Sequence, residues 1–122
     1  MQFQWSHFID IAAFLFNHAD DTTIPREAAY RSAISRAYYA AFCHAKWYAK
    51  EHCSFEPADN EEDHRDLRNY FKNHGKKELA RHLTQLRQWR NESDYDDPAY
   101  SATSQKVQSA IHLAKEVVSA LD

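Results

Sequence analysis

The chemically richest part of the sequence is LRQWRNESDYDD, residues 86–97, where polar side chains follow an apolar helical stripe. Leu83, Leu86 and Arg90 are spaced by three and four residues, so they share one face of a helix. A guanidinium on a core-facing stripe must be paired or must reach a cleft, because an unpaired buried charge is costly. Asp94 stands one turn later and is placed to pair with Arg90. The pattern therefore predicts either a structural ion pair at a helix end or an anion-binding group.

A second polar cluster precedes this stretch, on the helix expected around residues 25–51. Its hydroxyl groups can hydrogen-bond a guanidinium or a carboxylate. One interpretation is a polar seam that fixes how two helices pack, and the other is a cleft that binds phosphate. The candidate phosphate- or RNA-binding residues are Arg31, Ser35, Arg36, Tyr39 and Arg87.

A locally basic stretch covers the third and fourth expected helices, with aromatic residues interleaved. Its cationic residues are Arg65, Arg68, Lys72, Lys76, Lys77, Arg81, Arg87 and Arg90. Binders of single-stranded RNA combine such charges with stacking rings. Acidic residues dilute the stretch, and the formal net charge of the chain is -3, so composition gives no general argument for nucleic acid. A solvated helix face is the alternative, and the dilution favours it.

Composition predicts an all-α fold in one domain. The chain has 122 residues, only one Gly and three Pro, abundant Ala and few β-branched runs, which suits a few long helices with short connections. Apolar residues recur at helical spacing in most of the chain. We predict an up-and-down bundle of four to five helices, at about residues 4–19, 25–51, 60–74, 76–94 and 102–121, as a single domain over 1–122.

Sequence signals also mark the expected ends of these helices. Asp59 and Glu62 have the spacing of a capping box, with Asp in the role of Ser, at the start of the third helix. Gly75 is the expected C-terminal cap of that helix. The DDP sequence at 96–98 is expected to stop the fourth helix.

Cysteine and histidine usage argues against a disulfide and a metal site. Cys43 and Cys53 lie on one expected helix, roughly 15 Å apart, which is too far for a disulfide. Free thiols favour a reducing cytoplasm. The two cysteines and eight histidines form no C-x-x-C, H-x-x-x-H or H-E-x-x-H motif of a metal site. The single glycine cannot build a glycine-rich phosphate loop. We expect no cofactor, no metal, no signal peptide and no membrane span.

Two quoted motifs together resemble a family. The stretch YRSAISRAYYAAFCHAKWYA, residues 30–49, followed about forty residues later by LRQWRNESDYDD, resembles the HEPN domain, in its small stand-alone branch with an R-A-Y-Y-A-A-F helix and a later R-x-x-x-D-Y motif. The resemblance covers the whole chain. It implies a helical bundle that forms a homodimer, often beside a minimal nucleotidyltransferase as toxin and antitoxin.

The resemblance also implies a candidate active site, with one departure. Many HEPN proteins are metal-independent ribonucleases in which an Arg, an adjacent polar residue and a His four to six residues after the Arg do the chemistry. Arg90 matches that Arg and Asn91 the polar residue, whereas Asp94, Tyr95 and Asp96 stand where the His is expected. Arg90, Asn91, Asp94 and Tyr95 are therefore the catalytic candidates. A Tyr with an ordinary pKa near 10 is a poor general base at neutral pH, and an Asp beside an Arg has its pKa lowered.

Three functional hypotheses follow from the sequence and the resemblance. The first is a non-hydrolytic protein that binds RNA or nucleotide phosphates, or serves a nucleotidyltransferase partner. The second is a ribonuclease toxin with a divergent site that lacks the usual His. Another histidine, such as His44 or His82, would have to replace it, and no spacing argument favours either. The third is a dimerising adaptor in which Arg90 and Asp94 form a structural ion pair.

Overall fold

The computed structural model describes residues 2–21, 23–95 and 100–122, and over these residues the chain forms five helices and no strand. The helices are α1 (His7–Asn17), α2 (Arg26–His52), α3 (Glu62–Asn73), α4 (Lys77–Tyr95) and α5 (Ser104–Ala120). The prediction of an all-α bundle is confirmed, and each predicted helix end lies within three residues of the observed one. The predicted stop signal at 96–98 lies outside the described residues.

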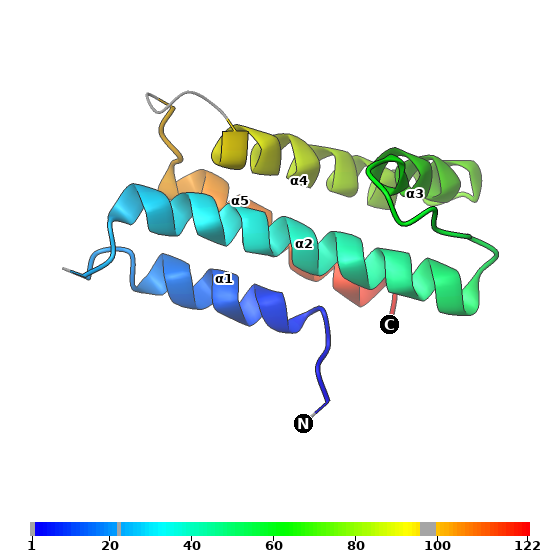
Figure 1. The fold of residues 1–122 in the computed structure, drawn as a ribbon, viewed down its shortest axis with the longest axis horizontal. Coiled ribbons are helices and arrows are strands. Elements are labelled where there is room, and N and C mark those ends of the chain that lie inside the picture. The colour runs from blue at the N-terminus through cyan, green and yellow to red at the C-terminus, as the bar shows by residue number, and fades with distance from the viewer. Residues whose placement is uncertain (1, 22, 96–99) are drawn as a thin grey trace.

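The longest helix, α2, forms the centre of the bundle. It packs against α1, α4 and α5, and α3 packs mainly against α4. Figure 1 shows α1 along one side of α2 and α4 along the other, with α5 behind and α3 beside the first half of α4. Because α2 carries four of the nine candidate residues and α4 carries the other five, the packing of these two helices decides whether the two sets meet.

Small residues on α2 allow its neighbours to approach closely. Alanines spaced by four residues form a ridge along α2 that is buried along its whole length, and its members are Ala29, Ala33, Ala37, Ala41 and Ala45. Beside it, the larger side chains of Ile34, Tyr38 and Phe42 fill the core. Such i, i+4 rows are the ridges that set how helices cross. The core is therefore built around one helix that has a row of small side chains beside a row of large ones.

The entry to α3 differs from the predicted capping box. Asp59 adopts a left-handed backbone conformation with φ 60°, and the residue before the helix, Glu61, makes no side-chain cap. Asp63, inside the helix, takes the role instead, because its carboxylate accepts the backbone N–H groups of Ala58 at 2.8 Å and Asp59 at 2.9 Å. Lys46 of α2 pairs with the same carboxylate at 2.9 Å. The prediction of a capping box is wrong because the N–H groups of the loop bind Asp63, a residue further along the helix.

The buried Asp63 ties this loop to the central helix. Burial acts to raise the pKa of Asp63, but the ion pair with Lys46 and the two backbone donors outweigh it and hold the pKa below its usual value. A carboxylate that accepts several hydrogen bonds stays ionised in this way. The charge of Asp63 therefore fixes the position of α3 relative to α2.

The end of α3 follows the prediction. Gly75 has a positive φ of 80°, and the N–H of Lys76 donates to the carbonyl of Phe71 at 2.9 Å, as in a Schellman motif. A residue without a side chain takes this conformation at little cost. The turn directs α4 back along α3, so that basic residues of α3 (Arg68, Lys72) and of α4 (Lys77, Arg81) line one hollow.

The two cysteines form no disulfide, as the spacing predicted. Cys43 is half-buried and Cys53 exposed, and both are free thiols. Burial raises the pKa of Cys43. No described helix is both long enough and apolar enough to cross a membrane.

A buried polar pair, Tyr38 and His64, connects α2 with α3. The Tyr38 hydroxyl forms a short hydrogen bond with Nδ1 of His64, whose ring stacks on Phe42 with centroids 4.1 Å apart. Burial raises the pKa of Tyr38, so its hydroxyl stays protonated. Burial, assisted by the charge of Arg87, lowers the pKa of His64 to about 4. His64 is therefore neutral in the folded protein at neutral pH.

This pair predicts acid sensitivity of the fold. The pKa of His64 is about 4 when folded, whereas an unfolded histidine titrates near 6.5. Between these values the unfolded chain binds the extra proton, so the free energy of unfolding should decrease as pH falls from 6.5 to 4. The loss attributable to His64 should reach about 2 to 3 kcal/mol, measured by urea unfolding across this range.

The control compares His64→Gln with an exposed histidine variant, His112→Gln. The difference in unfolding free energy between wild type and His64→Gln should shrink as the pH falls. Parallel pH profiles for wild type and His64→Gln would show that His64 does not cause the acid sensitivity.

Candidate functional site

The site is built on the last turns of α4, where Arg90 replaces a core leucine. Leu79, Leu83, Leu86 and Arg90 are all buried, which confirms that they share the face predicted from their spacing. The side chain of Arg90 is 7% exposed. A cation this deep in the protein needs partners.

Four side chains satisfy the buried guanidinium of Arg90. Its Nε donates to Asp94 Oδ2 at 3.1 Å and its Nη1 to Asn91 Oδ1 at 3.1 Å. Its Nη2 donates to the hydroxyls of Tyr39 and Tyr95, the latter at 3.2 Å. The guanidinium carbon also lies 5.1 Å from the centroid of each tyrosine ring. We call Arg90 and these four partners the arginine cluster.

The central helix contributes two members of this arrangement. Tyr39 belongs to the arginine cluster, and Ser35, one turn earlier on α2, donates its hydroxyl to Asp94 Oδ2 at 3.1 Å. Asp94 thus accepts from both Arg90 and Ser35, which joins the end of α4 to the first half of α2. The structure brings together all four catalytic candidates and two of the phosphate-binding candidates.

The other two arginine candidates on α2 lie around the cluster without touching Arg90. Arg31 pairs with Glu27 at 3.0 Å and donates to the carbonyls of Ser93 at 3.4 Å and Tyr100 at 2.5 Å. These bonds hold the chain on both sides of residues 96–99. Arg36 lies over the Tyr39 ring, with its guanidinium carbon 5.3 Å from the ring centroid. Arg36 therefore supports the position of a cluster residue, whereas Arg31 holds the chain next to the cluster.

The remaining candidate, Arg87, lies in a surface hollow next to the arginine cluster. We call this hollow the motif hollow, and its lining residues are Arg68, Thr84, Arg87, Gln88, Asn91 and Glu92. Asn91 belongs to both places. Because the Asn91 side-chain oxygen accepts from Arg90, its NH₂ group is left to serve as a donor outside the cluster. The hollow thus combines a family-motif residue with two arginines.

The motif hollow is electropositive. Arg87 pairs with Glu61 at 3.6 Å, a long contact to an exposed carboxylate. Glu92 is occupied by Lys106 at 3.3 Å. Burial lowers the pKa of Arg68, and the charge of Arg87 lowers it further, because two like charges face each other. An anion between the two arginines would relieve this repulsion.

Arg68 is a site residue that the sequence did not single out. It appeared only as one member of the basic stretch on the third and fourth helices. Its separation from Arg87 along the chain hides their proximity, which depends on the turn at Gly75 and the packing of α3 on α4. Helical spacing within either helix carries no signal for this contact.

No described histidine is among the hydrogen-bond partners of Arg90. His82 pairs with Glu78 at 3.1 Å, and His44 Nε2 lies 3.4 Å from the carbonyl of Leu121. His64 is electrostatically coupled to Arg90, but its Nδ1 is occupied by Tyr38. The described residues also contain no group of three metal-ligating side chains. Neither His44 nor His82, the histidines named as alternatives to the family His, forms a hydrogen bond with Arg90 in the described part of the chain.

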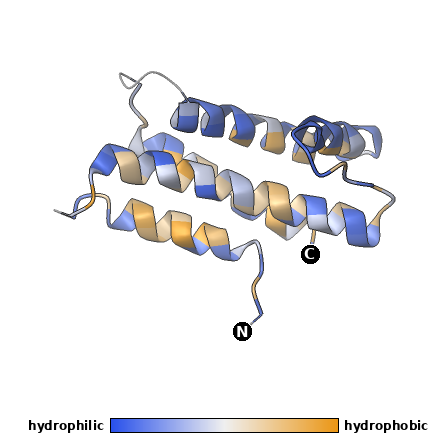
Figure 2. Cartoon of the chain, viewed as in Figure 1, coloured by the Kyte–Doolittle hydropathy of each residue, from blue (hydrophilic) through white to orange (hydrophobic). Residues whose placement is uncertain are grey.

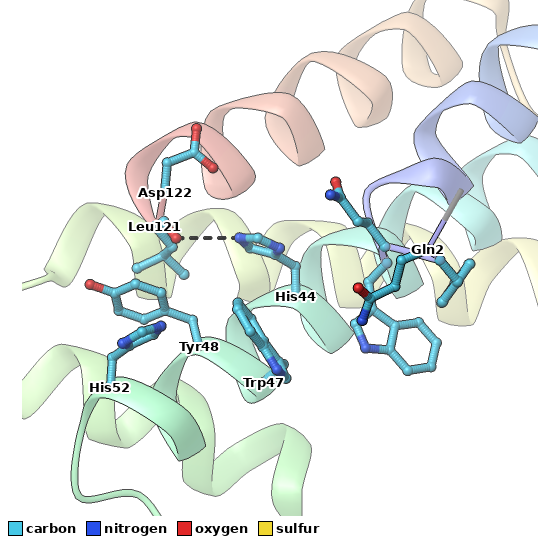
Figure 3. Close-up of a pocket in the computed structure, with 10 residues that line it drawn as sticks. Gln2, His44, Trp47, Tyr48, His52, Leu121 and Asp122 are labelled. Carbon is cyan, nitrogen blue, oxygen red and sulfur yellow. Dashed lines mark hydrogen bonds between the residues drawn. The ribbon is translucent and has the colours of Figure 1, made fainter.

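A second hollow lies at the other end of α2. Figure 3 shows His44, Trp47, Tyr48 and His52 of α2 around a pocket that Gln2, Leu121 and Asp122 also line. None of its lining residues belongs to the arginine cluster or the motif hollow. This aromatic pocket is therefore separate from the family motif.

Comparison with known proteins gives one match. The family model described as HEPN domain matches residues 6–122, nearly the whole chain. Searches of curated proteins and of solved structures found no match to this chain. The matched range includes every helix, the arginine cluster and the motif hollow. On this evidence the chain belongs to the HEPN domain family.

Proposed function

We propose that this HEPN protein binds RNA or nucleotide phosphates in the motif hollow without hydrolysing them. The observation that carries the proposal is the pair of facing arginines, Arg68 and Arg87, beside the family residue Asn91. Guanidinium groups and an amide NH₂ are suitable donors for phosphate oxygens. Neither guanidinium in the hollow is neutralised by a buried carboxylate among the described residues.

In this proposal Arg90 is a positioning residue. Its donors are taken by Asp94, Asn91 and two tyrosines, so it holds the Asn91 amide with the NH₂ group available to a ligand. This combines the first and third sequence hypotheses, because the ion pair is structural and the neighbouring surface binds phosphate. The structural role of Arg90 does not depend on ligand.

Among the described residues, the groups near Arg90 that could transfer a proton are already engaged, which favours binding without hydrolysis. Cleavage of RNA needs a group that removes the proton of the 2′-hydroxyl. Asp94 is engaged by Arg90 and Ser35, and the Nδ1 atom of His64 is engaged by Tyr38. Tyr95 accepts a hydrogen bond from Arg90. Ribonuclease activity therefore has weaker support than phosphate binding.

The proposed protein partners are inferred from the family alone. Homodimerisation, and association with a minimal nucleotidyltransferase in a toxin–antitoxin pair, are proposals that rest on the HEPN resemblance. A short nucleotidyltransferase gene adjacent to this one would support the second.

The phosphate proposal predicts loss of nucleotide binding when Arg87 is neutralised. Arg87→Gln should weaken binding of uridine 5′-diphosphate by about 10- to 100-fold, since a charge-assisted hydrogen bond contributes roughly 1.5–3 kcal/mol. Isothermal titration calorimetry at low salt measures the affinity. Arg65→Gln is the matched control, because Arg65 lies on the surface of α3 outside the hollow. Equal affinities of Arg87→Gln and Arg65→Gln for the nucleotide would refute the proposal.

The positioning role predicts that Arg90 affects stability as well as binding. Arg90→Ala removes the ion-pair partner of Asp94, which keeps only the hydrogen bond from Ser35, and removes the donor to two tyrosine hydroxyls. It should lower the free energy of unfolding by roughly 2–4 kcal/mol. Urea unfolding measures this change. Arg81→Ala is the control on the same helix, because its pair with Glu78 is exposed and should contribute less than about 1 kcal/mol. Equal stability of the two variants would contradict a structural role for Arg90.

A further inference from the structure

The motif hollow is one end of a longer groove between α3 and α4. A neighbouring hollow between α3 and α4 shares Arg68, Thr84 and Gln88 with the motif hollow, so these two hollows are continuous. Lys72 of α3 and Lys77 of α4 extend the groove away from the family motif. Figure 2 shows much of the α3 and α4 ribbons in the hydrophilic colour. The groove is therefore a polar surface that the family motif does not account for.

Positive charge is concentrated in the extended part of this groove. Its described lining holds Arg68, Lys72, Lys77 and Arg81 and no carboxylate, although the whole chain has 15 basic and 18 acidic residues. Arg81 pairs with Glu78, but both side chains are exposed. Among the described residues, no carboxylate forms an ion pair with Arg68, Lys72 or Lys77. The local excess of cations is therefore not cancelled within the protein.

Arg68 stands where the two parts of the groove meet. Its Nη1 atom is buried and has no hydrogen-bond partner among the described residues. A buried donor left unsatisfied costs free energy that a ligand oxygen can recover. Arg68 also faces the like charge of Arg87. An anion at this point would satisfy the donor and reduce the repulsion at once.

The rest of the lining favours contact with a sugar–phosphate backbone. Asn69, Thr84, Gln85 and Gln88 supply amides and a hydroxyl, and the described lining includes no aromatic ring on which a base could stack. Contacts to phosphate and sugar position a strand without reading its sequence. The groove therefore fits a nucleic-acid backbone better than isolated bases.

The length of the groove fits several phosphates. Lys77, Arg81, Thr84 and Gln88 are spaced by four, three and four residues, so they follow one face of α4. Eleven residues of helix extend for roughly 16 Å. A single nucleoside diphosphate cannot contact cations along this whole distance.

We infer that the α3–α4 groove binds the backbone of a single nucleic-acid strand, whose phosphates run from Lys77 and Arg81 to Arg68 and Arg87. The inference rests on the proposed function, because the motif hollow holds one end of the strand. It adds the extended surface, the sequence-independent mode of recognition and a ligand several nucleotides long.

The test compares a long and a short ligand on the same variant. Lys77→Gln/Arg81→Gln removes two cations from the far end of the groove and leaves the motif hollow intact. Fluorescence anisotropy with a labelled uridine 20-mer should show about tenfold weaker binding at 100 mM salt. The slope of log affinity against log salt concentration should become less steep by about 1.4, because each phosphate contact on a single strand contributes roughly 0.7. Affinity for uridine 5′-diphosphate should stay unchanged.

The control variant is Lys50→Gln/Lys115→Gln, which removes the same charge from exposed positions on α2 and α5. If both double variants bind the 20-mer equally well, the groove is not the binding surface. If the wild type binds the diphosphate but binds the 20-mer no more tightly, the inference fails and the motif hollow survives. If an equally charged poly-glutamate peptide displaces the 20-mer at equal concentration, the groove is instead a surface for acidic polypeptide. Failure of the diphosphate to bind would refute the proposed function itself.

Discussion

The buried guanidinium of Arg90 is the constraint on which the family-motif end of this bundle depends. A charge that is 7% exposed must be satisfied by the protein, and here the partners come from two helices. Tyr39 comes from α2, whereas Asn91, Asp94 and Tyr95 follow Arg90 on α4. The cluster therefore specifies how the end of α4 sits on the central helix. It also fixes the orientation of Asn91, which faces the neighbouring hollow.

The bundle separates its apolar and its charged surfaces. The central helix buries a ridge of alanines that lets α1, α4 and α5 approach closely. The α3–α4 pair lies on one side of the bundle, as Figure 1 shows, and carries the basic residues of the groove. Concentrating like charges along a groove is unfavourable for the free protein. The pKa of Arg68 is lowered mainly by burial, and the charge of Arg87 lowers it further. A ligand with regularly spaced negative charges reverses this effect, because its phosphates replace repulsion with attraction.

Much of the fold could be predicted from the sequence, because helix periods and breaker residues are local signals. The five helices, the alanine ridge and the Gly75 turn all depend on residues close together in the chain. The capping box failed because Asp63, rather than Asp59, collects the loop N–H groups with help from Lys46 on another helix. At the site, the pairing of Arg90 with Asp94 is also local. The contacts of Arg90 with Tyr39 and of Ser35 with Asp94 depend on packing between helices, and so does the proximity of Arg68 and Arg87.

The most direct test of this account locates the ligand on the protein. A two-dimensional ¹H–¹⁵N NMR titration with the uridine 20-mer reports each backbone amide separately. The account predicts the largest chemical-shift changes at Arg68, Arg87 and Asn91, which line the motif hollow, with further changes along the α3–α4 groove. Changes confined to the aromatic pocket around Trp47 and Tyr48 would contradict it.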